Sequence, residues 1–254
     1  MMGGAGRFLR KELSEHIRTW RLPVLGGVFL FFALTGPILA MLTPALLRSL
    51  QAGQPGLVIQ IPVPGWRDAY AQWIKNLSQI GAFVMILVAA GSVSGEVSKG
   101  TAVLVLTKPL SRVDFIMCKA VVFFSIVVVE VVLGTVVTQA VTLLVFGSAP
   151  WAAIWTPTIV WLVFAALLIA IATLASSIVP TLAAAGLGLV AFFAISIAAM
   201  WGPVARFSPA GLTFAPSRIL LGQPVALAWP LVTAAAGALA LIAIAALLFS
   251  RREL

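Results

Sequence analysis

The sequence predicts an all-α membrane protein with six transmembrane helices. Of its 254 residues, 62% are hydrophobic and only 9% are charged, and the mean hydropathy is +1.14. Soluble domains are much richer in charged residues. A membrane-spanning helix needs about 20 predominantly apolar residues, and the sequence holds six such windows: 22–42, 75–94, 115–146, 155–178, 182–201 and 226–249.

The windows do not alternate apolar with polar residues, as the strands of a membrane β-barrel do, so helices are favoured. Six spans and one substantial loop use up most of the chain. We therefore expect residues 1–254 to form a single transmembrane domain.

Residues 6–21 precede the first window and predict an amphipathic helix. Leu9, Leu13, Ile17 and Trp20 fall within an arc of roughly 80° when the chain turns about 100° per residue. Such a helix lies along the inner membrane face, with its basic side toward anionic headgroups. We expect it to be either a topology anchor alone or an anchor that also contacts a cytoplasmic partner. The basic residues on its other side and margins are Arg7, Arg10, Lys11, Arg18 and Arg21.

His16, the only histidine of the chain, also belongs to this segment. On a helix at the membrane surface, we expect its side chain to be solvated or interfacial and not to be a metal ligand.

The basic residues indicate the orientation of the chain through the positive-inside rule. With a cytoplasmic N-terminus, the outside holds five of the 16 Lys and Arg residues: Arg48, Arg67, Lys75, Arg206 and Arg218. The inside holds the other 11: Arg7, Arg10, Lys11, Arg18, Arg21, Lys99, Lys108, Arg112, Lys119, Arg251 and Arg252. We expect a multi-pass protein of the plasma membrane with both termini in the cytoplasm. The net charge of +9 is interpreted as a topology signal, and no nucleic-acid partner is expected.

Two segments outside the windows are expected on the outer side. Residues 44–76 form the one long excursion, predicted to be either a loop packed on the outer rim or an external gate. Trp66, Tyr70 and Trp73 follow one another at helical spacing there, which suits the membrane interface. Residues 202–224 contain four prolines and predict an external or re-entrant pair of short helices.

Three charged residues fall inside the windows. Lys75 and Lys119 lie near window ends, where a long side chain reaches the headgroups. Glu130 lies deep in the third window, and an ionised side chain facing lipid there would cost about 2.5–3.5 kcal/mol. Glu130 should therefore face inward or be protonated.

Gly134 and Thr138 follow Glu130 at i+4 and i+8 and continue the same helix face. These three residues predict either a substrate path or dimer interface, or a neutral, hydrogen-bonded Glu that holds two helices together. The fifth window opens with the small residues of "AAAGLG", which predict a close approach of another helix.

Catalytic and metal-binding patterns are absent from the sequence. The chain has one His, one Cys and seven acidic residues, with no metal-ligand spacing among them. Gly95 and Gly100 have the glycine spacing of a phosphate-binding loop, but Thr101 stands where that loop needs its Lys. We expect no catalytic residue, no metal, no cofactor bound by this chain, and no ATP hydrolysis by the chain alone.

The stretch between the second and third windows gathers charge in an otherwise apolar sequence. Residues 96–106 predict a short helix that exposes Glu96 and Lys99, and Pro109 disfavours helix at the residue before it. Ser111 and Asp114 have the spacing of a capping box in front of the third span. A short helix held rigidly between two spans would transmit motion to both, whereas an ordinary solvated loop would not.

This stretch, "SGEVSKGTAVLVLTKPLSRVDFIMCKAV", resembles the cytoplasmic loop of type-2 ABC transporter permeases. The basic "FLRKEL" opening, the six spans, the broken segment before the last span and the "RREL" ending agree with the resemblance. The family usually has a more charged stretch just after the Glu, whereas Val97 and Ser98 are neutral here. The residues that carry the likeness in the loop are Glu96, Gly100, Thr101, Leu104, Leu106, Pro109, Ser111, Arg112 and Lys119.

The resemblance implies an interfacial elbow helix at the start of the chain and a coupling helix between spans two and three. The coupling helix, with Lys99 among its contact residues, would dock on a separate ABC ATPase subunit that holds ATP and Mg. Two permeases, identical or paralogous, would flank the substrate path of an exporter. Two other functions stay open: a membrane subunit that transmits force to a maturation or cell-envelope factor without transport, and a secondary transporter.

Overall fold

The computed structural model describes residues 2–52, 63–101 and 111–251, and these residues form helices and no strand. The predicted all-α class is confirmed. The helices are α1 (Met2–Arg18), α2 (Arg21–Ala52), α3 (Trp66–Asn76), a π-helical turn η1 (Leu77–Gly81), α4 (Ala82–Ala90), α5 (Ser94–Ser98), α7 (Arg112–Phe146), α8 (Trp151–Ile178), α9 (Thr181–Ala198), α10 (Gly202–Phe207), a 3-10 turn η2 (Pro209–Leu212), α11 (Ala215–Leu220) and α12 (Ala228–Ser250).

Among the described residues, six helical segments are long and apolar enough to cross a membrane, and each contains or overlaps one predicted window. The protein is therefore a multi-pass membrane protein. The spans are Arg21–Ser49, Trp66–Ser98, Arg112–Phe146, Trp151–Ile178, Thr181–Ala198 and Ala228–Ser250.

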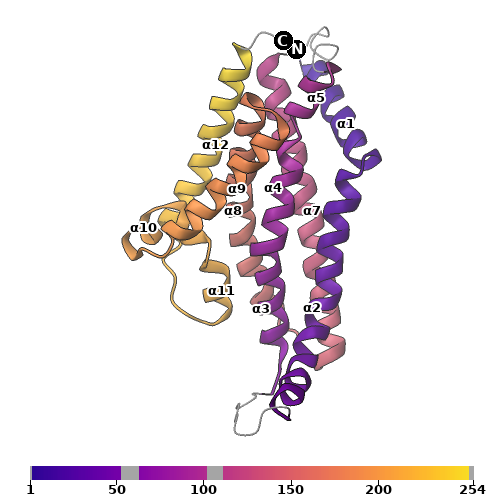
Figure 1. Cartoon of the computed structure of the whole chain (residues 1–254), viewed down its shortest axis with the longest axis vertical. Helices are drawn as coiled ribbons and strands as arrows, with labels where there is room; N and C mark the ends of the chain where they lie inside the picture. The colour runs from indigo at the N-terminus through magenta and orange to yellow at the C-terminus, as the bar shows by residue number, and fades with distance from the viewer. Residues whose placement is uncertain (1, 53–62, 102–110, 252–254) are drawn as a thin grey trace.

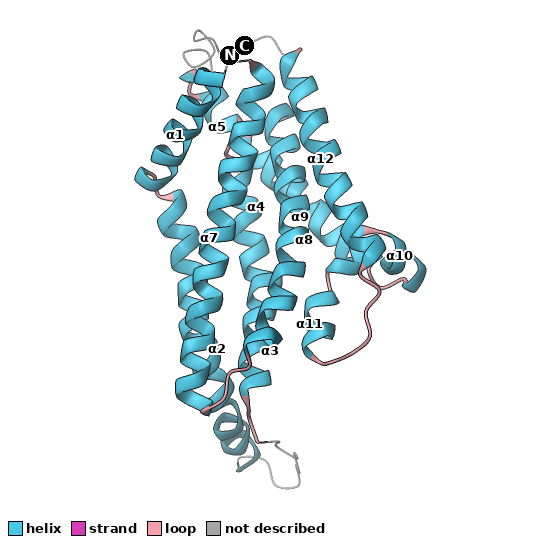
Figure 2. Ribbon diagram, turned by 180° about the vertical axis from the view of Figure 1, so that it is seen from behind, coloured by secondary structure: helices cyan, strands magenta, loops and turns pink. Residues whose placement is uncertain are grey.

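The spans pack side by side along the long axis of the molecule (Figure 1), and the same bundle is seen from behind in Figure 2. The beginning of α1, helix α5 and the end of α12 lie together at one end of the bundle. The short helices between α9 and α12 lie against its side and pack on α8, α3 and α12. The broken segment 202–224 thus forms two short α-helices and a 3-10 turn.

Both ends of the long excursion predicted at 44–76 are helical. Helix α2 continues to Ala52, with Pro37 and Pro44 inside it, and α3 begins at Trp66. Prolines are tolerated in membrane helices because neighbouring groups satisfy the freed backbone. Residues 53–62 lie outside the described part of the chain.

Two of the three aromatic residues of α3 belong to the protein core. Tyr70 and Trp73 are fully buried, and Trp73 Nε1 donates to Thr135 Oγ1 of α7 at 3.2 Å. The interface prediction is wrong for these two residues because α3 packs against α2 and α7, so its apolar face meets helices instead of lipid.

Small residues let helices approach closely at several places among the described residues. A Cβ on Gly188 of α9 would lie 2.6 Å from Ile86 Cγ2 of α4, so the close contact predicted for "AAAGLG" is confirmed. A Cβ on Gly134 of α7 would lie 2.5 Å from Trp73 Cη2 of α3.

Candidate functional site

A buried group of ion pairs joins three helices at the end of the bundle that carries α5. Lys119 of α7 donates through Nζ to both carboxylate oxygens of Glu12 of α1, at 3.1 and 3.0 Å. The same Nζ donates to Glu96 Oε1 of α5 at 2.7 Å. All three side chains are buried. We call Glu12, Glu96 and Lys119 the charge triad.

Lys11 and Glu15 of α1 extend the charge triad toward the surface. Lys11 Nζ lies 2.7 Å from Glu15 Oε2, 3.2 Å from Glu12 Oε1 and 3.4 Å from Glu96 Oε1. Partial burial alone would lower the pKa of Lys11, but the hydrogen bond to Glu15 and the nearby carboxylates raise it overall. Partial burial likewise opposes ionisation of Glu15, but the hydrogen bond and charge of Lys11 lower its pKa overall.

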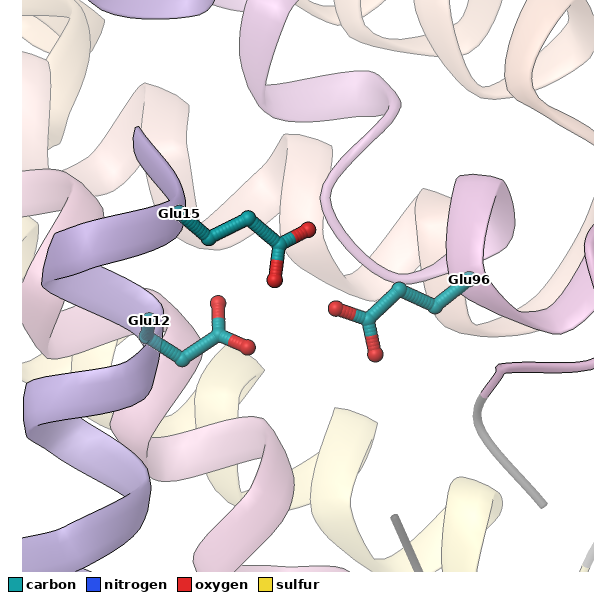
Figure 3. A group of neighbouring side chains, drawn as sticks. All are labelled: Glu12, Glu15 and Glu96. Carbon is teal, nitrogen blue, oxygen red and sulfur yellow. The ribbon is translucent and has the colours of Figure 1, made fainter. Parts of the chain in front are cut away.

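Three carboxylates converge at this place, Glu12 and Glu15 from α1 and Glu96 from α5 (Figure 3). One oxygen of each lies within 4.8 Å of the others, close enough to share a metal ion. Yet the ammonium groups of Lys11 and Lys119 already contact these oxygens. The lysines thus compensate the negative charge that would attract a cation.

The charge triad fixes α5 to its neighbours because a buried charge is stable only with its partners. Removing one member of a buried ion pair costs roughly 3–5 kcal/mol, since the other charge stays buried and uncompensated. Helix α5 has only five residues, and so short a helix does not hold itself together. Its position therefore depends on contacts to α1, α7 and α8.

Ser176 of α8 supplies the contact to α8. Its Oγ accepts from the backbone N–H groups of Val93 and Ser94 at 3.1 and 3.0 Å and donates to the carbonyl of Ala90 at 2.6 Å. Ser94 Oγ also lies 2.7 Å from Thr181 Oγ1 of α9. These bonds hold the turn between α4 and α5.

Helix α5 stands where the coupling helix was predicted, but its bounds differ from the prediction. One residue that was predicted to be exposed is buried. Helix α5 runs from residue 94 to 98 instead of starting at 96, and Gly100 turns the chain just after it with a φ of +68°. Glu96 is buried, so the prediction that it is exposed is wrong: its carboxylate pairs with Lys119. Lys99, Gly100 and Thr101 are exposed. Leu104, Leu106 and Pro109 lie outside the described residues.

Ser111 caps the start of α7, and Arg112 connects it to the end of α12. Ser111 Oγ accepts from the backbone N–H of Asp114 at 3.0 Å, which confirms the predicted N-cap. Arg112 Nη1 lies 3.5 Å from the carbonyl oxygens of Phe249 and Ser250. The positive charge of Arg112 near these carbonyls complements the negative C-terminal end of the α12 dipole.

Helix α1 has one face that packs on the protein and one face that is exposed. Leu13 and Ile17 of α1 and Trp20 just after it are exposed on the protein surface, which suits the predicted membrane-facing stripe. Leu9, the fourth residue of that stripe, is partly buried and packs against the core cluster that includes Phe8. Arg10 and Arg18 are also exposed. The side chain of Arg7 lies outside the described part of the structure.

Arg21, the last of the predicted elbow residues, makes a specific contact within the protein. Its Nη2 donates to the carbonyl of Gly91 at 2.9 Å. Arg21 therefore ties the beginning of α2 to the end of α4 in addition to any role at the membrane surface.

Two other predictions for this region are wrong. His16 is buried, with Nδ1 donating to the carbonyl of Glu12 at 3.0 Å, because it lies on the side of α1 that packs on α7 and near Phe123. Lys119 does not reach the headgroups; its side chain is only 1% exposed. Sequence reasoning missed Glu12, although it stands four residues after Phe8 and four before His16, on the buried side of α1.

The second predicted group, Glu130, Gly134 and Thr138, faces neighbouring helices. Glu130 lies against Gly26 of α2, and Gly134 lies against Trp73 of α3. Thr138 is buried, and its Oγ1 has no hydrogen-bond partner among the described residues. The helix-interface interpretation therefore fits the contacts of Glu130 and Gly134. The predicted hydrogen bond of Glu130 is not found, because both of its carboxyl oxygens lack a partner among the described residues.

A cavity of about 320 Å³ lies elsewhere, between the second half of α2 and helix α3. It combines an apolar wall with Asp68, Gln72 and Lys75 of α3. Because it borders the predicted external excursion, it is compatible with an outer contact site.

Comparison with known protein families assigns the chain to one of them. The model of a family described as "Protein of unknown function (DUF2705)" matches residues 57–254. Glu96 and Lys119 lie inside the matched region, and Glu12 lies before it. No curated protein matches the sequence.

Proposed function

The chain belongs to the DUF2705 family of proteins of unknown function, and we propose that it is the membrane-spanning permease subunit of an ATP-driven exporter. In this proposal a separate ABC ATPase subunit binds ATP and Mg, and a second permease copy or paralogue completes the transporter. Both termini and α5 face the cytoplasm across the plasma membrane.

The charge triad is the observation that carries the proposal. A coupling element has to be short, reachable by a partner, and fixed firmly to the spans that it moves. Helix α5 forms the last turn of span two, Glu96 pairs with Lys119 of span three, and the same Lys119 pairs with Glu12 of α1. A force on α5 would therefore act on the elbow helix and on two spans together.

The exposed residues after α5 provide the partner contact in this proposal. Lys99, Gly100 and Thr101 are exposed, and the chain continues into the stretch that holds Leu104, Leu106 and Pro109. Ser111 and Arg112 begin α7, and the Arg112 side chain contacts the end of α12. In this proposal the two residues therefore join the contact surface to span three and to the last span. Glu96 positions α5 from inside and does not contact the ATPase.

The chain also has surfaces for a second permease copy or for lipid. The described faces of α9 and α12 expose large apolar side chains such as Phe193, Ile197, Val232 and Leu239. In a membrane such faces meet either lipid or another helix, where close packing supplies the attraction.

Purification of the full-length chain from its native membranes in mild detergent tests the proposal. We expect an ATP-binding subunit to co-purify and to hydrolyse ATP faster in the complex than alone. Lys99→Glu should weaken the association about tenfold, corresponding to about 1.4 kcal/mol. Lys75→Glu is the matched control, because Lys75 is also exposed but lies in α3, toward the other end of the bundle.

Two outcomes would replace the proposal with another function. Substrate movement driven by an ion gradient, with this chain alone in vesicles, would indicate a secondary transporter. ATPase stimulation by an envelope factor without any transported substrate would indicate a force-transmitting subunit.

A further inference from the structure

Glu130 is the acidic residue that lies deepest in a membrane span, and it has no polar partner. It stands near the middle of α7, 18 residues after Arg112 and 16 before Phe146. Its side chain is only 8% exposed, and both carboxyl oxygens lack a hydrogen-bond partner among the described residues. The carboxyl group is therefore buried without a hydrogen bond to any described residue.

Gly26 of α2 makes room for this carboxyl group. A Cβ at Gly26 would lie 3.1 Å from Glu130 Oε1 and 3.6 Å from its Cδ. At the adjacent Gly27, a Cβ would meet nothing within 4 Å. Of this glycine pair, Gly26 alone forms a notch for the Glu130 side chain.

The charged groups on the surrounding helices do not reach Glu130. None of the described ones forms a hydrogen bond or an ion pair with it. Lys119 of α7 is held by the charge triad, and Arg21 of α2 donates to the carbonyl of Gly91. The remaining charged or titratable groups of α1, α2 and α3 with described side chains are Arg10, Lys11, Glu12, Glu15, His16, Arg18, Arg48, Arg67, Asp68, Tyr70 and Lys75.

An ionised Glu130 carboxylate would have no hydrogen-bond donor and no counter-charge among the described residues. Buried charges are stable in proteins only when they are paired or hydrogen-bonded, and otherwise the group takes up a proton and becomes neutral. A neutral carboxylic acid still contains a donor, but it costs far less to bury than a carboxylate.

We propose that Glu130 is a proton-binding site of the membrane domain, occupied and closed in this arrangement of α2 and α7. The proton is held on the carboxyl group in the notch at Gly26, and it leaves only when α2 moves away from α7 and lets water reach the group. This inference stands without the ATPase partner and is tested on the isolated chain.

Infrared spectroscopy of the purified chain in lipid detects the proton directly. A protonated carboxyl group has a C=O stretch well separated from that of a carboxylate, and the chain has only seven acidic residues. We expect a carboxylic-acid band at neutral pH that shifts when glutamate carries a 13C-labelled carboxyl group. Glu130→Gln should remove the band, while Glu96→Gln should leave it in place. Absence of the band in the unchanged chain, or its persistence in Glu130→Gln, would overturn the proposal.

The notch is tested with a matched pair of variants. In Gly26→Ala the new methyl group would displace the carboxyl group and open its contact with α2. We therefore expect the band to disappear at a lower pH, by about one pH unit, which is a tenfold change in proton affinity. Gly27→Ala should titrate like the unchanged chain. Equal titration of both variants would show that α2 does not close the site.

Discussion

Lys119 Nζ lies 2.7 Å from Glu96 Oε1, and both residues are buried although they belong to the most polar stretch of the chain. The pair attaches helix α5, at the end of span two, to helix α7 of span three. Because Lys119 also contacts Glu12, any displacement of α5 disturbs the packing of α1 on α7. This relationship leads to the first prediction.

Lys119→Met should lower the free energy of unfolding by roughly 3–5 kcal/mol, because Glu12 and Glu96 lose their buried cation and keep only the partly exposed Lys11 as a partner. Thermal unfolding in detergent, followed with a thiol-reactive dye, measures the change. Cys118 is the only cysteine of the chain and is buried, so the dye reports its exposure. The substitution lies beside Cys118, and tryptophan fluorescence therefore serves as a second signal.

Lys11→Met is the control for this prediction. Lys11 contacts the same carboxylates, but its side chain is 42% exposed, and exposed ion pairs contribute about 0–1 kcal/mol. In a chain that carries Glu12→Gln and Glu96→Gln, the Lys119→Met change should cost much less than in the unchanged chain. Equal losses in both backgrounds would contradict the ion-pair explanation.

The six spans could be predicted from the sequence because hydropathy is a local property. The N-cap at Ser111 and the close contact at Gly188 were also predictable, since each depends on residue type and short spacing. Hydropathy does not fix where a helix ends: α2 continues to Ala52, beyond its predicted window of 22–42.

The charge triad could not be predicted, because it unites residues 12, 96 and 119 from three separate helices. A Lys near the end of an apolar window suits two environments, the headgroups or a buried acid, and the sequence alone does not distinguish them. The surroundings of Lys119 are decided by how α1 packs on α7.

Because His16 is buried, the folded protein should lose stability at mildly acidic pH. Burial lowers its pKa below the ordinary value of 6.5, with the charges of Arg21 and Lys119 adding to the effect and the hydrogen bond to Glu12 opposing it. Below pH 6.5 the unfolded chain takes up a proton that the folded chain resists. The contribution of His16 is therefore complete above that pH and declines as the pH falls toward the folded value.

Unfolding temperatures between pH 7.5 and 5.5, a range of about one unit on either side of the ordinary His value, measure this effect. The unfolding temperature should fall with pH in the unchanged chain and fall less steeply in His16→Gln. A parallel decline in the two proteins would assign the pH dependence to other groups, such as Glu15, whose lowered pKa acts at more acidic pH.

Ser176→Ala should loosen the attachment of α5 to α8. The change removes the acceptor of two backbone N–H groups, those of Val93 and Ser94, and a buried unsatisfied donor costs about 1–3 kcal/mol. Hydrogen exchange of these two amides, measured by mass spectrometry, should become faster. Ser196→Ala is the control, because Ser196 Oγ donates only to a carbonyl of its own helix, that of Phe192. Unchanged exchange in Ser176→Ala would mean that the triad alone holds α5.

Gly188→Ala should separate α9 from α4. The added Cβ would lie 2.6 Å from Ile86 Cγ2, and a β-branched side chain has little freedom to turn away. Overpacking of this kind costs about 1–3 kcal/mol, so the unfolding temperature should fall. Gly186→Ala, two residues earlier on α9, meets nothing within 4 Å and should raise stability slightly, since Ala is the better helix former. The same thermal measurement compares the two, and a similar decrease in both would show that helix propensity or lipid contact, and not the Ile86 contact, decides the outcome.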